Sequence, residues 1–240
     1  MVLHVKDTTG RFGTRPHFSP EELDAECEQI ISDFLRELYG SVKYPVMTDD
    51  LTKLIEAHAA DLDLYADLSS LGEDVEGLTE FVPGAKPRVR ISRLLSDNAR
   101  RENRFRTTMT HELGHVHFHN YLWDSASQQS NLFTPGQHSR QPMTCKKQTI
   151  IGANKTDWME WQAGYACGAI LMPGTAVKRL VGEFFNAHGI FGSVTPDSLH
   201  GQNLIQSTMA AFQASAEAAT IRLSQLNFLS DSASSQALWQ

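Results

Sequence analysis

Hydrophobic side chains recur at helical spacing in several segments of the chain. In the first segment, between residues 20 and 40, one face carries Leu23, Cys27, Ile30, Ile31, Phe34, Leu35 and Leu38. Ser19 and Glu22 have the spacing of a capping box at its start, and Gly40 suits its end. Similar patterns predict further helices that begin near Thr48, Asp97, Asp157, Thr175, Leu199 and Ser215.

Residues 61–91 follow a different pattern, in which apolar and polar side chains alternate. Leu62, Leu64 and Ala66 alternate with polar residues, and residues 77–91 read as two further strands around a turn. A period of two is typical of strands, so this region predicts a small antiparallel sheet of about three strands. The predicted fold class is therefore α+β, mostly helical, with a small sheet and a C-terminal helical region.

Composition and charge exclude some classes of function. The chain has 240 residues, of which 41% are hydrophobic, and a formal net charge of −7. This acidic balance argues against a general nucleic-acid or anionic-membrane binder. No apolar run approaches about 18 residues, and the N-terminal segment lacks an apolar signal core. We therefore expect a cytoplasmic protein without membrane contact.

The cysteines form a sparse set of three, Cys27, Cys145 and Cys167. An odd number without C-x-x-C spacing argues against a disulfide framework. Free buried thiols are the favoured interpretation. The alternative, in which Cys145 and Cys167 join a metal site, stays open.

Candidate chemistry is concentrated in residues 111–115, which read His-Glu-Leu-Gly-His. On a helix, His111 and His115 lie one turn apart on nearly the same face, so both imidazoles can bind one metal ion. Glu112 lies about 100° around the helix axis, where its carboxylate can reach a water on the metal instead. This H-E-x-x-H pattern is the signature of a zinc-dependent peptidase with histidine ligands and a glutamate base. It predicts one Zn²⁺ per chain.

Basic residues and two further histidines flank the motif. The basic residues are Arg100, Arg101, Arg104 and Arg106. They form either a solvated face or a surface that guides substrate. His119 lies about 12 Å along the helix axis from His111, so these two residues do not bind the same ion. We expect His119 to pack beside or support the ligands, and His117 to lie at the surface.

Glu160 is the preferred third metal ligand. It shares a stripe with Gly164 and Gly168 on the helix expected after Asp157. Each glycine costs about 1 kcal/mol in a helix interior. The stripe makes sense if the backbone of the helix that carries Gly114 approaches closely and brings Glu160 to the metal.

Two assignments stay open. Glu160 either binds the metal or only caps its own helix, in which case Glu183 or Asp124 is the third ligand. Peptide hydrolysis also needs a donor for the developing oxyanion, or other contacts to substrate. The candidates for this role are Tyr165, Arg106, His138 and His188.

Several motifs together resemble the ImmA/IrrE-type zinc metallopeptidases. The likeness rests on residues 106–115 (Arg-Thr-Thr-Met-Thr-His-Glu-Leu-Gly-His), His119, residues 160–166 (Glu-Trp-Gln-Ala-Gly-Tyr-Ala), residues 171–173 (Leu-Met-Pro) and residues 215–223. It covers most of residues 20–228. Within the family's Glu-x-Glu-Ala-Asn segment, Gln162 and Gly164 replace the second glutamate and the asparagine.

The resemblance implies a regulatory protease of the cytoplasm. Its substrate would be a protein, a helix-turn-helix transcriptional repressor on a separate chain, and Glu160 would be the third ligand. No direct contact with nucleic acid or membrane is expected. The alternative is a non-catalytic metal-bound regulator that binds a repressor or another partner without cleaving it.

The expected domain organisation has four parts. Residues 1–18 are a flexible leader, residues 19–174 a zincin-like metallopeptidase domain, residues 175–228 a C-terminal helical region packed on it, and residues 229–240 a disordered tail. Residues 124–156 are a long loop within the peptidase domain, either a lid or poorly ordered. An edge of the small sheet either aligns extended substrate or only covers one side of the metal-binding helix.

Overall fold

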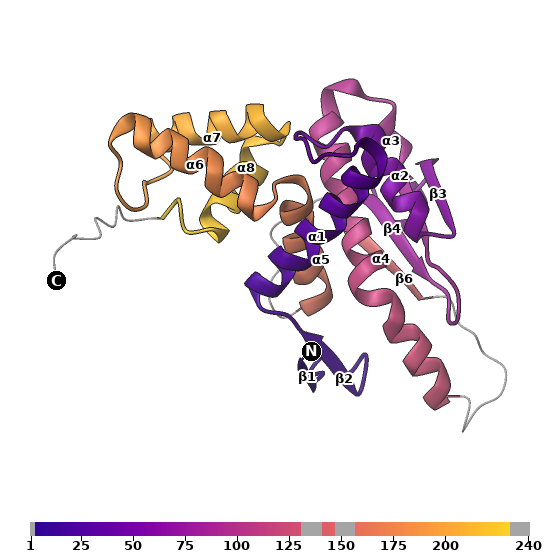
Figure 1. Ribbon diagram of the computed structural model, residues 1–240. Helices are drawn as coiled ribbons and strands as arrows, with labels where there is room; N and C mark the ends of the chain where they lie inside the picture. Colours follow the sequence, from indigo (N-terminus) through magenta and orange to yellow (C-terminus); the bar gives the residue numbers. More distant parts are fainter. Residues whose placement is uncertain (1–2, 131–140, 147–156, 231–240) are drawn as a thin grey trace. The chain divides into compact units, whose positions relative to one another are not determined.

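The computed structural model describes residues 3–130, 141–146 and 157–230 (Figure 1). They form a mostly helical α+β fold, as predicted. The chain divides into two compact units, one of Met1–Leu23 with Met47–Cys167 and the other of Asp24–Val46 with Gly168–Gln240. The predicted domain boundary at residue 174 therefore does not match these units. The second unit resumes at Gly168, and it also includes residues 24–46.

The first unit contains a four-stranded sheet in the order β3-β5-β4-β6. Its strands are β3 (Asp61–Ala66), β4 (Val75–Phe81), β5 (Arg88–Ser92) and β6 (Gln141–Lys146). The three predicted strands are present, and β6 adds a fourth within the segment expected to be a loop. β4 is antiparallel to both of its neighbours, whereas β3 is parallel to β5, so the sheet is mixed and not wholly antiparallel as predicted.

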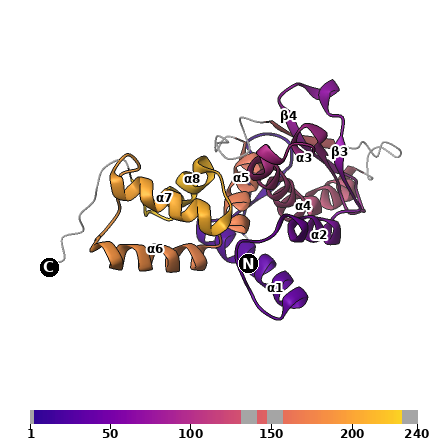
Figure 2. The same cartoon turned by 90° about the horizontal axis from the view of Figure 1, so that it is seen from above.

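Three helices accompany this sheet, namely α2 (Thr48–His58), α3 (Arg93–Ser96) and α4 (Glu102–Ser130), with short 3₁₀ turns η1 (Ser69–Leu71) and η2 (Ala99–Arg101). α4 contacts β4, β5 and β6 along one face of the sheet (Figure 2). It continues to Ser130, past residue 124 where the long loop was expected to begin. Residues 131–140 and 147–156, the rest of that loop, lie outside the described residues.

A buried carboxylate holds the start of α4 against β4. Glu76 is 6% exposed and pairs with Arg101 at 2.6 Å and with Arg104 at 2.5 Å. These two arginines are therefore neither a fully solvated face nor free to guide substrate. The pairing places β4 beside the metal-binding motif.

The N-terminal segment forms a hairpin instead of the expected flexible leader. Strands β1 (Leu3–Lys6) and β2 (Thr14–His17) pair antiparallel. Between them, buried Asp7 accepts hydrogen bonds from the backbone N–H groups of Thr9 and Phe12, both at 2.9 Å. Burial opposes ionisation of Asp7, but these hydrogen bonds hold its pKa below the usual value. The hairpin depends on a short turn that the Asp7 carboxylate organises, and not on a pattern of hydrophobic residues. The sequence pattern therefore did not predict it.

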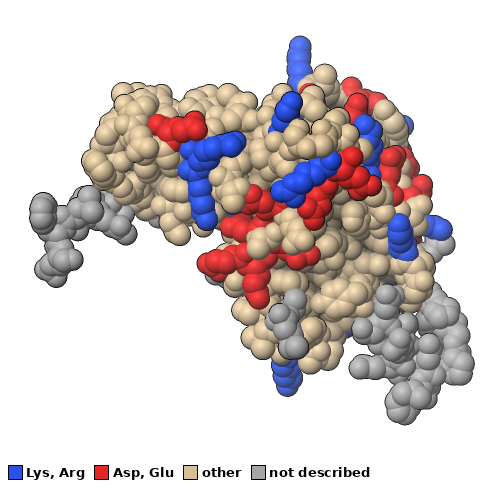
Figure 3. Space-filling view, in the orientation of Figure 1, with Lys and Arg blue, Asp and Glu red and all other residues tan. Residues whose placement is uncertain are grey.

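The second unit is helical. It contains most of α1 (Pro20–Tyr39), the end of α5 (Trp158–Leu171), and α6 (Gly174–His188), α7 (Leu199–Phe212) and α8 (Ala216–Gln225). The predicted capping box is present, since the Ser19 N–H donates to Glu22 and the Glu22 N–H donates to Ser19 Oγ. Acidic side chains gather along α1 (Figure 3), in line with the negative net charge.

Arg222 of α8 is the central polar contact of this unit. Its guanidinium is fully buried, lies 2.6 Å from the Asp24 carboxylate and donates from Nε to the Met172 carbonyl. This ion pair joins α1 to α8 and explains why residues 24–46 belong with the C-terminal helices. Among the described residues, no helix is long and apolar enough to cross a membrane. The tail expected at residues 229–240 is described only to Ser230, where Leu229 bridges to Val194.

Candidate metal centre

Two imidazoles and one carboxylate converge where α4 passes α5. His111 and His115 are fully buried, and their Nε2 atoms lie 3.1 Å apart. Glu160 comes from the first turn of α5, with Oε2 3.2 Å from His111 Nε2 and Oε1 3.2 Å from His115 Nε2. These residues form a group able to hold a metal ion. The predicted ligand set is thus brought together, and Glu160 faces the histidines instead of only capping its own helix.

The spacing of these atoms fits a small tetrahedral ion. A tetrahedral site with metal–ligand distances of about 2.0–2.1 Å has ligand–ligand edges of about 3.3–3.4 Å. The separations of 3.1 and 3.2 Å between the ligand atoms are close to that value. The two 3.2 Å contacts reach different oxygens of Glu160, so the carboxylate faces both imidazoles, and the three residues could together hold one metal ion.

Glycine allows the two helices to approach, though at a different position from the one predicted. A Cβ added at Gly114 would lie 3.0 Å from the Ala163 Cα and 3.3 Å from the Ala166 Cβ. The close contact is therefore between Gly114 and alanines of α5. A Cβ added at Gly168 of the predicted stripe would instead lie 3.7 Å from the Arg222 Cδ atom. The predicted close approach is present at Gly114, but Gly168 does not take part in it.

Glu112 lies against β4. It is fully buried, and its Oε2 accepts a 2.5 Å hydrogen bond from Thr79 Oγ1. Among the described residues, its Oε1 has no hydrogen-bond partner. A Cβ at Gly77 would overlap Oε1, so the strand must carry glycine opposite this carboxylate. Burial raises the pKa of Glu112, against the opposing effect of the nearby histidines.

The electrostatics of the cluster favour a positive charge at its centre. Burial alone would raise the pKa of Glu160, but the facing imidazoles of His111 and His115 bring it well below its usual value. Burial alone would lower the pKa of His115, but the Glu160 carboxylate raises it. Among the described residues, neither Glu112 nor Glu160 pairs with lysine or arginine. A bound cation would supply the missing charge.

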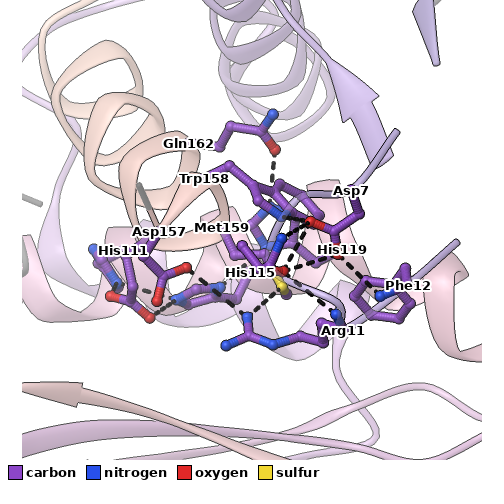
Figure 4. Close-up of polar contacts among 12 residues, drawn as sticks. Asp7, Arg11, Phe12, His111, His115, His119, Asp157, Trp158, Met159 and Gln162 are labelled. Atoms are coloured by element: carbon purple, nitrogen blue, oxygen red, sulfur yellow. Dashed lines mark hydrogen bonds and ion pairs between the residues drawn. The ribbon is translucent and has the colours of Figure 1, made fainter. Parts of the chain in front are cut away.

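A second row of polar contacts lies behind His115. His115 Nδ1 and His119 Nδ1 are 3.0 Å apart, and His119 Nε2 is 3.0 Å from Gln162 Oε1 (Figure 4). Gln162 Nε2 in turn donates to the Pro16 carbonyl of β2 at 3.3 Å. Burial, followed by the charge of His115, places the pKa of His119 well below its usual value. His119 supports a ligand, as expected, whereas no sequence signal identified Gln162 as its partner.

The N-terminal hairpin reaches the start of α5. Trp158 Nε1 donates to Asp7 at 3.2 Å, and Arg11 Nη1 lies 3.0 Å from the Met159 sulfur and 3.8 Å from Asp157 (Figure 4). These contacts fall within three residues of Glu160. The segment expected to be a leader therefore helps to position a metal ligand.

Two side chains that were predicted to contact substrate, Arg106 and Tyr165, are buried. Arg106 is 1% exposed and donates to Thr48 Oγ1, so it braces α4 against α2. Tyr165 is 5% exposed, and its ring packs 5.8 Å from that of Trp161. Neither side chain is open to an incoming peptide. Their position on the motif helices suggested the role, but each points into the core.

The other candidates belong to the second unit or lie outside the described residues. His188 belongs to the second unit, where its Nδ1 contacts the Phe184 carbonyl within α6. Glu183 is also on α6, while His138 and the side chains of Asp124 and Cys145 lie outside the described residues. Cys167 donates to the Thr107 carbonyl, and burial raises its pKa to about 12, so it is a structural thiol. Cys27 is also a buried free thiol.

Comparisons with protein-family models and with curated proteins found no match.

Proposed function

We propose that this protein is a zinc-dependent endopeptidase of the ImmA/IrrE type. The observation that carries the proposal is the environment of Glu112. One oxygen of this buried carboxylate is held by Thr79, and the other has no hydrogen-bond partner among the described residues. A buried carboxylate with a purely structural role normally has hydrogen-bond partners for its oxygens. Glu112 has a partner for only one oxygen and lies beside a group able to hold a metal ion, which is typical of a functional residue.

The donor set supports zinc as the ion. Two imidazoles and one carboxylate are a common ligand set of catalytic zinc sites, which keep the fourth position open. His111, His115 and Glu160 would hold the ion. When bound, Zn²⁺ would polarise the substrate carbonyl and lower the pKa of a water molecule.

Glu112 would move the proton in both halves of the reaction. Its Oε1 accepts a proton from the attacking water while Thr79 keeps the carboxylate oriented through Oε2. The water oxygen bonds to the carbonyl carbon, the carbon–nitrogen bond breaks, and the proton passes from Glu112 to the departing amine nitrogen. Burial favours this role because it raises the pKa of Glu112 and so makes the carboxylate a stronger base.

The substrate proposal comes from the resemblance in the motifs. We propose a cytoplasmic role in which the protein cleaves a helix-turn-helix repressor carried on a separate chain. The competing function is a metal-bound regulator that binds the repressor without cutting it. The two functions differ in whether Glu112 is needed as a base.

Incubation of the zinc-loaded protein with candidate repressors tests the proposal. Wild type is expected to cleave, and Glu112→Gln to lose about 10²–10⁴-fold in rate, since the amide does not accept the water proton. Both proteins should hold the same amount of zinc, because Glu112 is not a ligand. Equal cleavage by the two proteins rules out the mechanism, and tight repressor binding without cleavage favours the regulator.

A further inference from the structure

In the series of polar contacts behind His115, the chemistry of the groups determines which atom donates and which accepts each hydrogen bond. They run from the Pro16 carbonyl of β2 through Gln162 and His119 to His115. Gln162, His119 and His115 are each at most 1% exposed. Water therefore does not replace any of these partners, and each group must act as a donor or an acceptor towards the next.

The Pro16 end of the series fixes the side-chain amide of Gln162. A carbonyl oxygen only accepts, so the amide NH₂ of Gln162 must face Pro16, at 3.3 Å. The amide oxygen then faces His119 Nε2 at 3.0 Å. Because an amide oxygen only accepts, His119 must carry its proton on Nε2.

The same logic passes through His119 to the metal ligand. A neutral His119 with its proton on Nε2 has a lone pair on Nδ1, which faces His115 Nδ1 at 3.0 Å. His115 must therefore donate from Nδ1. Neutral His115 then has its lone pair on Nε2, the atom that lies 3.2 Å from Glu160 in the candidate metal site.

We propose that Gln162 is a positioning residue that acts through His119 to fix the tautomer of His115 that binds the metal. The inference rests on the metal site proposed above. A histidine ligand whose other nitrogen has a defined partner keeps its ring orientation and its metal-binding tautomer. Here the final partner is a neutral amide anchored on the N-terminal hairpin, so no charge is added behind the ligand.

The tautomer of His119 in the metal-free wild type gives the first test, and it needs neither mutation nor activity. Nitrogen chemical shifts of labelled histidine are expected to show His119 protonated on Nε2. A proton on Nδ1 of neutral His119 would overturn the inference, because His115 would then lose its acceptor.

Zinc affinity of matched variants, measured by competition with a chelator, gives the second test. Gln162→Leu removes the acceptor and is expected to weaken zinc binding about 10–100-fold. His119→Phe should weaken it similarly. His119→Asn should stay within a few-fold of wild type, because the asparagine oxygen takes the place of Nδ1 as an acceptor for His115.

The double variant decides whether the effect passes through His119. In the His119→Asn background, Gln162→Leu is expected to leave zinc affinity unchanged, since the asparagine no longer depends on Gln162. An equal loss in both backgrounds would overturn the route through His119. Thr208→Val, which removes a buried hydrogen bond in the second unit, is the control for general destabilisation.

The outcomes separate this inference from the proposed function. If wild type binds no zinc, the metal site and the peptidase proposal fail together. If wild type binds zinc and Gln162→Leu binds it equally well, only the positioning role fails. Cleavage of a repressor by a Gln162→Leu protein saturated with zinc is compatible with both.

Discussion

Two clusters of buried charge, one around Arg222 in the second unit and one around Glu160 in the first, are compensated differently. In the second unit, the fully buried Arg222 guanidinium meets the Asp24 carboxylate at 2.6 Å and the Met172 carbonyl at 2.9 Å. Both the positive and the negative partner are side chains of the protein. Such a cluster is complete in itself and holds helices together.

In the first unit, the buried carboxylates of Glu112 and Glu160 face two imidazoles, and neither pairs with lysine or arginine among the described residues. Isolated buried carboxylates are costly, so an added cation would stabilise this cluster. The difference separates a structural ion pair from a binding site. It also predicts that substitutions in the two clusters affect different properties, stability in one and metal binding or activity in the other.

Arg222→Met should give the largest loss of stability. It leaves Asp24 without its buried partner and is expected to lower the free energy of unfolding by about 3 kcal/mol. Zinc affinity should not change, because the metal ligands belong to the first unit. Urea unfolding and chelator competition measure the two properties.

Arg36→Met is the matched control, since Arg36 pairs with Asp33 at 2.8 Å on the exposed face of α1. It should cost less than about 1 kcal/mol. Equal losses from the two arginine substitutions would remove the distinction between the buried and the surface pair.

Gly77→Ala should lower activity about 10²-fold while zinc remains bound. The added Cβ would overlap Glu112 Oε1 and lie 2.9 Å from Thr108 Cγ2, so the carboxylate proposed as the base would have to move. Peptidase rate and zinc content are the measurements. Gly182→Ala is the control, because its Cβ meets no atom within 4 Å. Full activity of Gly77→Ala would contradict the placement of Glu112 against β4.

Asp7→Asn should have a smaller effect, a loss of about 1–3 kcal/mol in the free energy of unfolding at neutral pH. The Asp7 carboxylate joins the hairpin turn to Trp158 of α5. Because folding lowers its pKa, its contribution is present above about pH 4 and is lost as the pH falls through the folded-state value.

The difference between wild type and Asp7→Asn should therefore shrink in acid. Asp63→Asn is the matched surface control, since exposed Asp63 of β3 also accepts a hydrogen bond from the backbone N–H two residues on, that of Tyr65. A hairpin that is only a loose leader would make the two substitutions equally mild at every pH.

The sequence predicted the three residues of the candidate metal site because their spacing is local. The spacing of His111 and His115 needs only one helix, and Glu160 was found through the next helix and the motif resemblance. By contrast, Thr79 meets Glu112 across 33 residues of sequence. That contact depends on how β4 lies against α4, which no periodicity encodes.

The N-terminal hairpin shows a second reason for missed features. Its strands are four residues each, and its turn depends on one carboxylate, Asp7, more than on hydrophobic alternation. For Arg106 and Tyr165 the prediction was wrong in the opposite direction. Their polar side chains lie near the motifs in sequence and suggested a contact with substrate, but both are buried. Local spacing thus predicted ligands, while contacts between distant segments required the fold.

The zinc content of the purified protein after dialysis, compared with that of Glu160→Ala, tests the central claim most directly. His111, His115 and Glu160 are expected to hold one zinc ion per chain at neutral pH, and Glu160→Ala to lose it. A wild-type protein without zinc, or a Glu160→Ala protein that holds it equally tightly, would contradict the proposed metal centre.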